Sequence, residues 1–251
     1  MEQSSERIIS LQRLVDQYNA TPGKPESVSC DKCLGKEYIH FLENGYIVAK
    51  ECACAEINRT LKRIERSGLK DLMELCTFDS YETTEKWQVQ AKQKAMDFAS
   101  GNQEDWFFAG GQIGSGKTHL CTAIVGSLMK QGKSAIYMLW VDEAVKLKAM
   151  VTDGEEYTNA IVKLKTIDIL YIDDFFKTEH EKRPTAADIR IAFELLNYRY
   201  INRNLITIIS SERTIDGILD VDESVGSRIY QRSKNHCLII EQDKSKNFRM
   251  K

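Results

Sequence analysis

Apolar residues follow a helical repeat near the start of the chain. They recur every three or four positions, which predicts a short helix, and prolines then end the pattern. The helical set is Ile8, Leu11, Val15 and Tyr18, and the breaking segment is Thr21 to Pro25. A second helical repeat begins at Ala55.

Short apolar runs alternate with helical repeats from about residue 85 onward. The expected strands are Trp106–Phe108, Ser134–Leu139, Asp168–Ile172, Leu205–Ile209 and Cys237–Ile240, and the expected helices lie at Glu85–Ala99, within Asp142–Lys165 and at Thr185–Ile201. Most of these strands are apolar throughout, which is typical of strands buried on both faces. The pattern predicts an α/β fold with a parallel sheet flanked by helices.

The stretch from Trp106 to Met129 contains the spacing G-x-x-x-x-G-K-[ST], formed by Gly111, Gly116, Lys117 and Thr118. It stands between an expected strand and a helical repeat, the context in which this spacing forms a phosphate-binding loop. Backbone amides would surround the phosphates of ATP, Lys117 would reach the outer phosphates, and Thr118 would hold Mg²⁺. The expected nucleotide-binding residues are Gly111, Gln112, Ile113, Gly114, Ser115, Gly116, Lys117, Thr118 and His119.

Two carboxylates follow the apolar strand that ends at Ile172. We expect Asp173 to hold Mg²⁺ through water and Asp174 to orient or deprotonate the attacking water. The separation from the phosphate loop allows the two strands to be neighbours in the sheet. Many ATPases carry Glu at the second position, and the shorter Asp174 predicts slow hydrolysis.

Four cysteines form two close pairs near the N-terminus, Cys30 with Cys33 and Cys52 with Cys54. Strand-like segments at Tyr38–Phe41 and Gly45–Val48 separate the pairs as in a hairpin. Four thiols suit one tetrahedral Zn²⁺, and so small a segment needs such a crosslink. The alternatives are reduced cysteines without metal, or His40 in place of one thiol.

Composition places limits on the class of protein. The chain has 251 residues, a net charge of −2 and 42% hydrophobic residues, so any contact with DNA must come from a local basic surface. No apolar run approaches membrane-spanning length, and the polar N-terminus is no signal peptide, so we expect a cytoplasmic protein without membrane partners. An odd count of seven cysteines argues against a disulfide framework.

Several motifs together resemble the bacterial replicative helicase loaders of the DnaC/DnaI type. These motifs are the phosphate loop, the Ile-Asp-Asp strand end, SSERTIDGILD from Ser210, VGSRIYQRS from Val225 and the closing NFRMK, all behind a four-cysteine segment. Such loaders are AAA+ ATPases related to the initiator DnaA and the transposition helper IstB, and phage-borne members share this layout. The resemblance covers Phe78 to Lys251 well and the preceding segment more loosely.

The resemblance implies further site residues. Arg228 matches the arginine finger that reaches the γ-phosphate of a neighbouring subunit, and Arg249 matches the sensor arginine within the same subunit. The sensor Asn is replaced by Glu212, with Ser211 as the residue that would serve instead. Each arginine has an alternative role as a surface ion-pair partner.

The cysteine-rich segment gives way to alternating helices and strands near residue 70, which predicts a domain boundary there, and the resemblance implies a function. Residues 1–70 would be a zinc-binding, partner-binding domain and residues 71–251 an AAA+ ATPase domain. The implied activity is ATP-dependent loading of a hexameric replicative helicase onto single-stranded DNA, with self-association through the ATP site. Lysines in the segment from Ala144 to Lys165 would face the DNA, or would belong to a solvated amphipathic helix. These lysines are Lys146, Lys148, Lys163 and Lys165.

Two other functions stay open at this point. An IstB-like transposition helper would keep the ATPase and change the partner, although such relatives generally lack this cysteine cluster. An adaptor switched by nucleotide, with little hydrolysis, would explain Asp174 and Glu212 at positions that usually carry other residues.

Overall fold

The computed structural model describes residues 2–23, 30–66, 69–101, 105–178 and 182–250. Contacts divide the chain into two compact units, Met1–Arg63 and Ile64–Lys251, and each is described by itself. Part of the proline-containing segment expected at residues 21–25 lies outside the described residues. None of the helices in the described segments combines the length and the apolar character needed to cross a bilayer.

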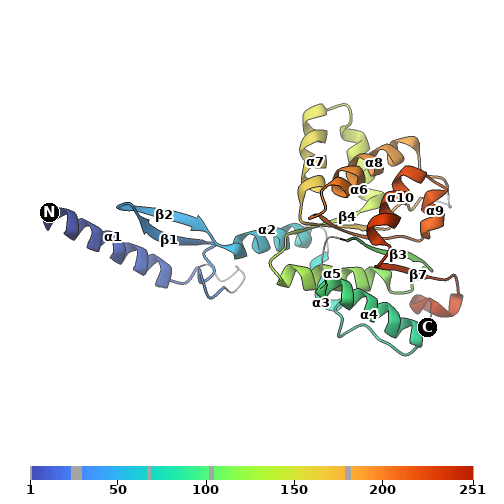
Figure 1. Ribbon diagram of the computed structural model, residues 1–251, viewed down its shortest axis with the longest axis horizontal. Coiled ribbons are helices and arrows are strands. Elements are labelled where there is room, and N and C mark those ends of the chain that lie inside the picture. Colours follow the sequence, from blue (N-terminus) through green and yellow to red (C-terminus); the bar gives the residue numbers. More distant parts are fainter. Residues whose placement is uncertain (1, 24–29, 67–68, 102–104, 179–181, 251) are drawn as a thin grey trace. The chain divides into compact units, whose positions relative to one another are not determined.

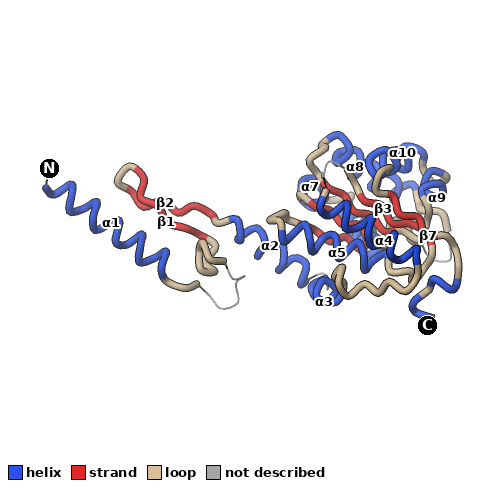
Figure 2. The backbone as a smooth tube through the Cα atoms, turned by 60° about the horizontal axis from the view of Figure 1, so that its bottom comes forward, coloured by secondary structure: helices blue, strands red, loops and turns tan. Residues whose placement is uncertain are grey.

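The first unit consists of a long helix, a hairpin and a second helix. Helix α1 (Glu2–Ala20) packs on strands β1 (Tyr38–Glu43) and β2 (Tyr46–Glu51), which pair antiparallel and are followed by α2 (Ala53–Arg66) (Figure 2). The rings of Tyr18 and His40 stack with centroids 3.6 Å apart, which joins α1 to the hairpin. The expected hairpin is therefore present, and α1 is longer than the short helix that its apolar repeat predicts.

The second unit alternates strands and helices, as the apolar runs predict. Its strands are β3 (Phe107–Gly111), β4 (Ala135–Leu139), β5 (Ile169–Asp173), β6 (Ile206–Ser210) and β7 (Cys237–Ile240). Its helices are α3 (Leu69–Leu75), α4 (Lys86–Ser100), α5 (Lys117–Lys130), α6 (Trp140–Met150), α7 (Gly154–Thr166), α8 (Ala186–Ile201), α9 (Ile215–Leu219) and α10 (Glu223–Ser233), with 3-10 turns at Lys244–Lys246 and Phe248–Met250.

All strand pairs in the five-stranded sheet are parallel, and the strand order is β4-β5-β6-β3-β7. Strands β3 and β5 are therefore not neighbours, which corrects the expectation drawn from their separation in sequence. Strand β6 lies between them, pairing Ile208 with both Phe107 and Tyr171. The end of β6 thus lies directly beside Asp173.

Helices cover both faces of the sheet. Helices α3, α4 and α5 lie on one face, and α6 to α10 lie on the other (Figure 1). Alternate strand residues separate between the two layers: Leu170 and Ile172 join the core under α6 to α10, whereas Phe107 packs against Phe98 of α4.

Three helices could not be predicted from the pattern of apolar residues. Helices α3 and α9 are too short to show a repeat, and α10 contains Gly and several Ser, which are weak helix formers. Local caps specify the last two: the Thr214 hydroxyl accepts a hydrogen bond from the Gly217 amide, and the Asp222 carboxylate accepts one from the Val225 amide.

A buried arginine ties the layer of α7 and α8 to the sheet. Arg199 of α8 is 0% exposed, and its guanidinium donates to the Oγ1 atom of Thr207 and to a ring of backbone carbonyls. The accepting carbonyls belong to Leu164, Lys165, Ile167, Asp168 and Ile206. These bonds satisfy carbonyls at the end of α7 and at the starts of β5 and β6, although the Asp168 carbonyl also accepts a hydrogen bond from the Ile206 amide.

We predict that Arg199→Lys lowers the free energy of unfolding by about 2 kcal/mol or more, because a lysine ammonium cannot reach all of these acceptors. Urea unfolding followed by circular dichroism measures the change. Arg190→Lys, an exposed position on the same helix, is the matched control and should stay within about 0.5 kcal/mol of the wild type. Equal midpoints for the two variants would contradict the role given to Arg199.

Candidate functional site

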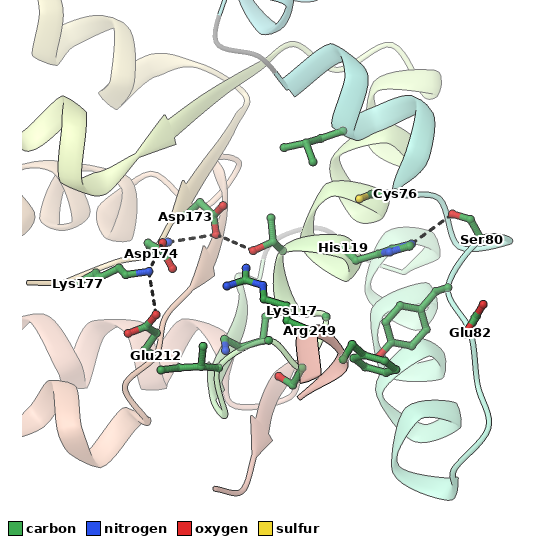
Figure 3. A pocket seen from close by; sticks show the side chains of 18 residues that line it. Cys76, Ser80, Glu82, Lys117, His119, Asp173, Asp174, Lys177, Glu212 and Arg249 are labelled. Carbon is green, nitrogen blue, oxygen red and sulfur yellow. Dashed lines mark hydrogen bonds and ion pairs between the residues drawn. The ribbon is translucent and has the colours of Figure 1, made fainter. Parts of the chain in front are cut away.

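A pocket of ≈ 600 Å³ opens beside the phosphate loop, at the carboxyl end of β5 and the N-terminus of α5 (Figure 3). This volume is within the range of small-molecule sites. The lining residues come from the segment 72–82, the loop 113–119, the acidic strand end, Glu212 and the C-terminal turn. Ligands of open parallel sheets bind at the carboxyl ends of the strands, where this pocket lies.

The phosphate loop adopts a conformation that needs glycine. Gly111, Gly114 and Gly116 have φ values of +102°, +69° and +85°. A Cβ atom at Gly114 would lie 2.0 Å from Oδ1 of Asn247, and one at Gly111 would lie 2.0 Å from the carbonyl oxygen of Ile240. Helix α5 begins immediately afterwards, so its free amides and positive dipole end face the loop.

Lys117 is the buried cation of the loop. It is 7% exposed, and its Nζ donates to the carbonyls of Gly111 at 2.9 Å and Gln112 at 2.6 Å. Burial lowers the pKa of Lys117, and the charges of Glu212 and Asp174 oppose that shift. An ammonium group that is held only by carbonyls in a pocket fits the phosphate groups of a nucleotide.

Asp173 is the point at which three elements meet. Its Oδ1 accepts hydrogen bonds from the hydroxyls of Thr118, at 3.2 Å, and Ser210, while its Oδ2 accepts one from the hydroxyl of Tyr137 at 3.0 Å. The residue is only 5% exposed. The hydroxyl of Thr118 and the carboxylate of Asp173 are thus already paired, and both are oxygen ligands of the kind that Mg²⁺ prefers.

Two partners of Asp173 have no motif in the sequence. Tyr137 stands on β4, and burial together with the charge of Asp173 raises its pKa. Ser210 ends β6, one residue before the serine that we expected to serve as the sensor. The available signal was positional: polar residues at the ends of neighbouring parallel strands converge on one edge of the sheet.

The carboxylates of Asp174 and Glu212 face the same pocket and share a cation. Lys177 Nζ lies 2.9 Å from an oxygen of each, as Figure 3 shows. Ser211 instead donates to the carbonyl of Phe175 at 2.7 Å and is 1% exposed. Of the two expected sensor residues, the structure therefore brings Glu212 to the pocket and directs Ser211 into the neighbouring turn.

Aromatic residues form the other end of the pocket. His119 donates from Nε2 to the carbonyl of Thr77 at 2.9 Å, and its ring lies 5.2 Å from that of Tyr81. The hydroxyl of Tyr81 is buried, has no hydrogen-bond partner among the described residues, and has its pKa raised by burial to about 12. This orphaned hydroxyl beside Gly116 is consistent with a missing polar ligand.

The C-terminal segment closes the loop from behind. The amide of Phe248 donates to the carbonyl of Gly114 at 2.9 Å, and the side-chain oxygen of Gln112 accepts from the amide of Asp243 at 2.7 Å. Ser115 is buried and donates to the carbonyl of Gln112 at 2.7 Å. Arg249 and Ile113 line the pocket, so the expected sensor arginine is within the site of its own chain.

Arg228 lies outside this pocket. Its Nε donates to Oδ1 of Asn197 at 3.0 Å, its Nη1 donates to the carbonyl of Ser224 at 2.7 Å, and its guanidinium lies 4.9 Å from the ring centroid of Phe193. The expected arginine finger therefore cannot act on the nucleotide site of its own chain in this arrangement.

The lysines expected to face DNA are mostly paired: Lys146 with Glu143, Lys148 with Asp188, and Lys165 with Glu194.

The four N-terminal cysteines meet at one point. Their Sγ atoms all lie within 4.8 Å of one another, with Cys33 and Cys54 at 3.2 Å and Cys30 and Cys52 at 3.8 Å. Four thiolates at Zn–S distances of about 2.3 Å would be about 3.8 Å apart, so the cluster fits a tetrahedral Zn²⁺. His40 is not in the group and packs on Tyr18 instead.

Solved structures share the fold of the second unit. A crystal structure of the DnaC helicase loader superposes with a TM-score of 0.57 at 19% identity, covering 68% of this chain and 98% of that one. DnaI gives 0.55 at 18% identity, over 68% and 93% of the two chains, and AMPPCP-bound DnaA from Aquifex aeolicus gives 0.55 at 20% identity, over 69% and 52%. The expected AAA+ fold, a parallel sheet flanked by helices, is confirmed.

Sequence relatives extend the likeness to most of the chain. The phage-like element PBSX protein XkdC of Bacillus subtilis (strain 168) is 30% identical over 84% of this chain and 82% of its own length, and protein YqaM of the same strain is 33% identical over 78% of this chain and 64% of its own length. The replicative helicase loader DnaC of Escherichia coli (strain K12) is 29% identical over 50% of this chain and 54% of its own length. A family model described as IstB-like ATP binding protein matches residues 26–251, and the chain therefore belongs to the family of IstB-like ATP-binding proteins.

Proposed function

We propose that this chain is an ATP-dependent loader that places a hexameric replicative helicase on single-stranded DNA. One observation carries the proposal: a nucleotide-binding unit similar to DnaC is joined to a separate unit built around four cysteine thiols. The first unit would supply the ATP-dependent step, and the second would bind the helicase. An IstB-like transposition helper needs no such cysteine unit.

The geometry of the pocket supports binding of ATP with Mg²⁺. The loop amides and Lys117 would hold the phosphates, and the paired oxygens of Thr118 and Asp173 would hold the metal ion. When bound, Mg²⁺ offsets negative charge on the phosphates. Asp174 stands at the mouth of the site, where it would orient the attacking water during hydrolysis.

The position of Arg228 supports the proposal that the chain self-associates. A guanidinium outside its own pocket can stabilise a γ-phosphate only in a neighbouring subunit, so binding of ATP would tie subunits together and its hydrolysis would release them. Phe193 and Asn197 of α8 hold Arg228 on the surface that would meet that neighbour.

The first unit supports a structural zinc ion. Its buried residues are few, namely Val15, Cys33, Cys52, Cys54, Ala55 and Asn58 among the residues with described side chains. So small a core needs a crosslink, and the ion would join the segment before β1 to the start of α2. Exposed Phe41 and Tyr46 on the hairpin offer apolar contact to a partner protein.

Single-stranded DNA would be contacted by the lysine-bearing helices α6 and α7. Lys163, in the last turn of α7, forms no ion pair within the described part of the chain, whereas the other three lysines would exchange a carboxylate for a phosphate. Binding through these lysines would weaken as the salt concentration rises.

We predict that the full-length chain with ATP captures the replicative helicase from a lysate of its source organism, as identified by mass spectrometry. Cys30→Ser/Cys33→Ser should abolish capture because zinc and the packing of the first unit are lost, whereas Cys237→Ser, outside both the cluster and the nucleotide pocket, should not. Zinc content should be about one ion per wild-type chain. Capture of a transposase, or equal capture by both variants, would contradict the loader function.

We predict that Arg228→Ala and Asp174→Asn each reduce ATP hydrolysis by roughly a hundredfold or more while ATP still binds. An equal mixture should recover about a quarter of the wild-type rate, because one neighbour pair in four then combines an intact pocket with an intact finger. Phosphate release measures hydrolysis, and Arg203→Ala, at an exposed position, is the control. A mixture no more active than its components would show that Arg228 does not act between subunits.

A further inference from the structure

Lys177 forms a bridge between two carboxylates of the nucleotide pocket. Its Nζ lies 2.9 Å from Oδ2 of Asp174 and 2.9 Å from Oε1 of Glu212 (Figure 3). The three side chains are 37%, 31% and 30% exposed, respectively, so the group is partly withdrawn from water. Asp174 and Glu212 are also the two residues that depart from the usual pattern of such sites, and one lysine contacts both.

A constrained turn positions Lys177 beside these two carboxylates. Asp174 and Phe176 have φ values of +53° and +56°, and the amide of Lys177 donates to the carbonyl of Asp174 at 3.0 Å. A left-handed conformation is costly for phenylalanine and persists only where the surroundings impose it. The ring of Phe176 is fully buried against those of Phe175 and Trp140, with centroid distances of 4.1 Å and 5.4 Å, and this packing supplies that constraint.

The segment carrying Glu212 is fastened to the same turn. The hydroxyl of Ser211 donates to the carbonyl of Phe175 at 2.7 Å, and Nε of Arg213 donates to the carbonyl of Phe176 at 3.2 Å. The two residues that flank Glu212 in the sequence therefore bind the turn that carries Lys177. This explains why Ser211 is directed away from the pocket.

The bridge changes the charge that a nucleotide would meet. The pocket is lined by four carboxylates, those of Glu82, Asp173, Asp174 and Glu212, and by the cations Lys117, Lys177 and Arg249. Without Lys177, two of these carboxylates would repel a terminal phosphate. Partial burial lowers the pKa of Lys177, but its pairs with Asp174 and Glu212 outweigh burial and raise the pKa overall, so the bridge stays charged.

We infer that Lys177 is a positioning residue of the nucleotide site, which neutralises Glu212 and holds Asp174 in place so that the pocket accepts a triphosphate. The inference rests on the proposed ATP site. It accounts for a glutamate at the position where the resemblance described above implies asparagine, because Glu212 and Lys177 would act as one unit. Lys177 would act through the two carboxylates and not by direct contact with the phosphates.

The test is a double-mutant cycle read by nucleotide affinity. Fluorescent analogues of ATP and ADP, with Mg²⁺, are titrated against the wild type, Lys177→Met, Glu212→Gln and the double variant. We expect Lys177→Met to weaken ATP binding roughly tenfold and ADP binding less, because only ATP would bring a third phosphate toward the uncompensated carboxylates. Glu212→Gln in the same chain should restore ATP affinity to within about threefold of the wild type.

Control variants distinguish the effect of the lost charge on nucleotide affinity from an effect on folding stability. Lys177→Arg should keep wild-type affinity, and Lys50→Met removes an exposed ion pair with Glu43 in the first unit and should leave nucleotide binding unchanged. Urea unfolding of each variant without nucleotide should give similar midpoints, since Lys177 is partly exposed.

Two results would overturn the inference. Unchanged ATP affinity in Lys177→Met would show an ordinary surface ion pair, and a loss that Glu212→Gln fails to restore would show direct contact between Lys177 and the phosphates. Lys117→Ala tests the underlying site: if that variant binds ATP normally, the proposed function itself fails, whereas loss of binding there together with no effect of Lys177→Met rejects only the bridge.

Discussion

The buried carboxylate of Asp173 is the interaction on which the nucleotide site depends. It receives hydroxyl groups from three elements, namely Thr118 of α5, Tyr137 of β4 and Ser210 of β6. A carboxylate at 5% exposure is tolerated because these donors satisfy its oxygens. The bonds therefore set the distance between the phosphate loop and the acidic strand, even though β6 separates their strands in the sheet.

Backbone constraints on either side of Asp173 complete the pocket. On one side, Gly114 has a φ of +69° and contacts the C-terminal segment, whose Asn247 side chain would have to move to admit a Cβ atom. On the other, buried Phe176 holds the turn that presents Lys177. In each case, residues far apart in the sequence hold a short segment in one conformation. That segment then positions the polar groups of the site. Arg228, by contrast, is held on a different surface, outside the pocket of its own chain.

The features that could be predicted from the sequence are local ones. A phosphate loop is specified by a few neighbouring residues, so its strand and helix followed directly from Gly111 to Thr118, and the paired spacing of the cysteines likewise predicted their meeting. Strand order is not local, and the apolar runs of β3, β5 and β6 contain nothing that places β6 in the middle. The ion pairs of Lys177 with Asp174 and Glu212 could not be predicted for a similar reason. They depend on positive φ angles at Asp174 and Phe176, and these angles cannot be predicted from the residue types alone. The contact of Tyr137 with Asp173 could not be predicted either, because it depends on the pairing of β4 with β5.

The central claim is that Asp173 joins the metal ion to the nucleotide, and the measurement that tests it most directly is a titration of a fluorescent ATP analogue with and without Mg²⁺. The wild-type chain should bind the analogue at least about tenfold more tightly with Mg²⁺ than without it. Asp173→Asn should have the same affinity with and without Mg²⁺, equal to that of the wild type without Mg²⁺. Asp168→Asn, immediately before the opposite end of the same strand, is the matched control and should keep the full effect of Mg²⁺. An Asp173→Asn variant that retains the wild-type dependence on Mg²⁺ would contradict the account.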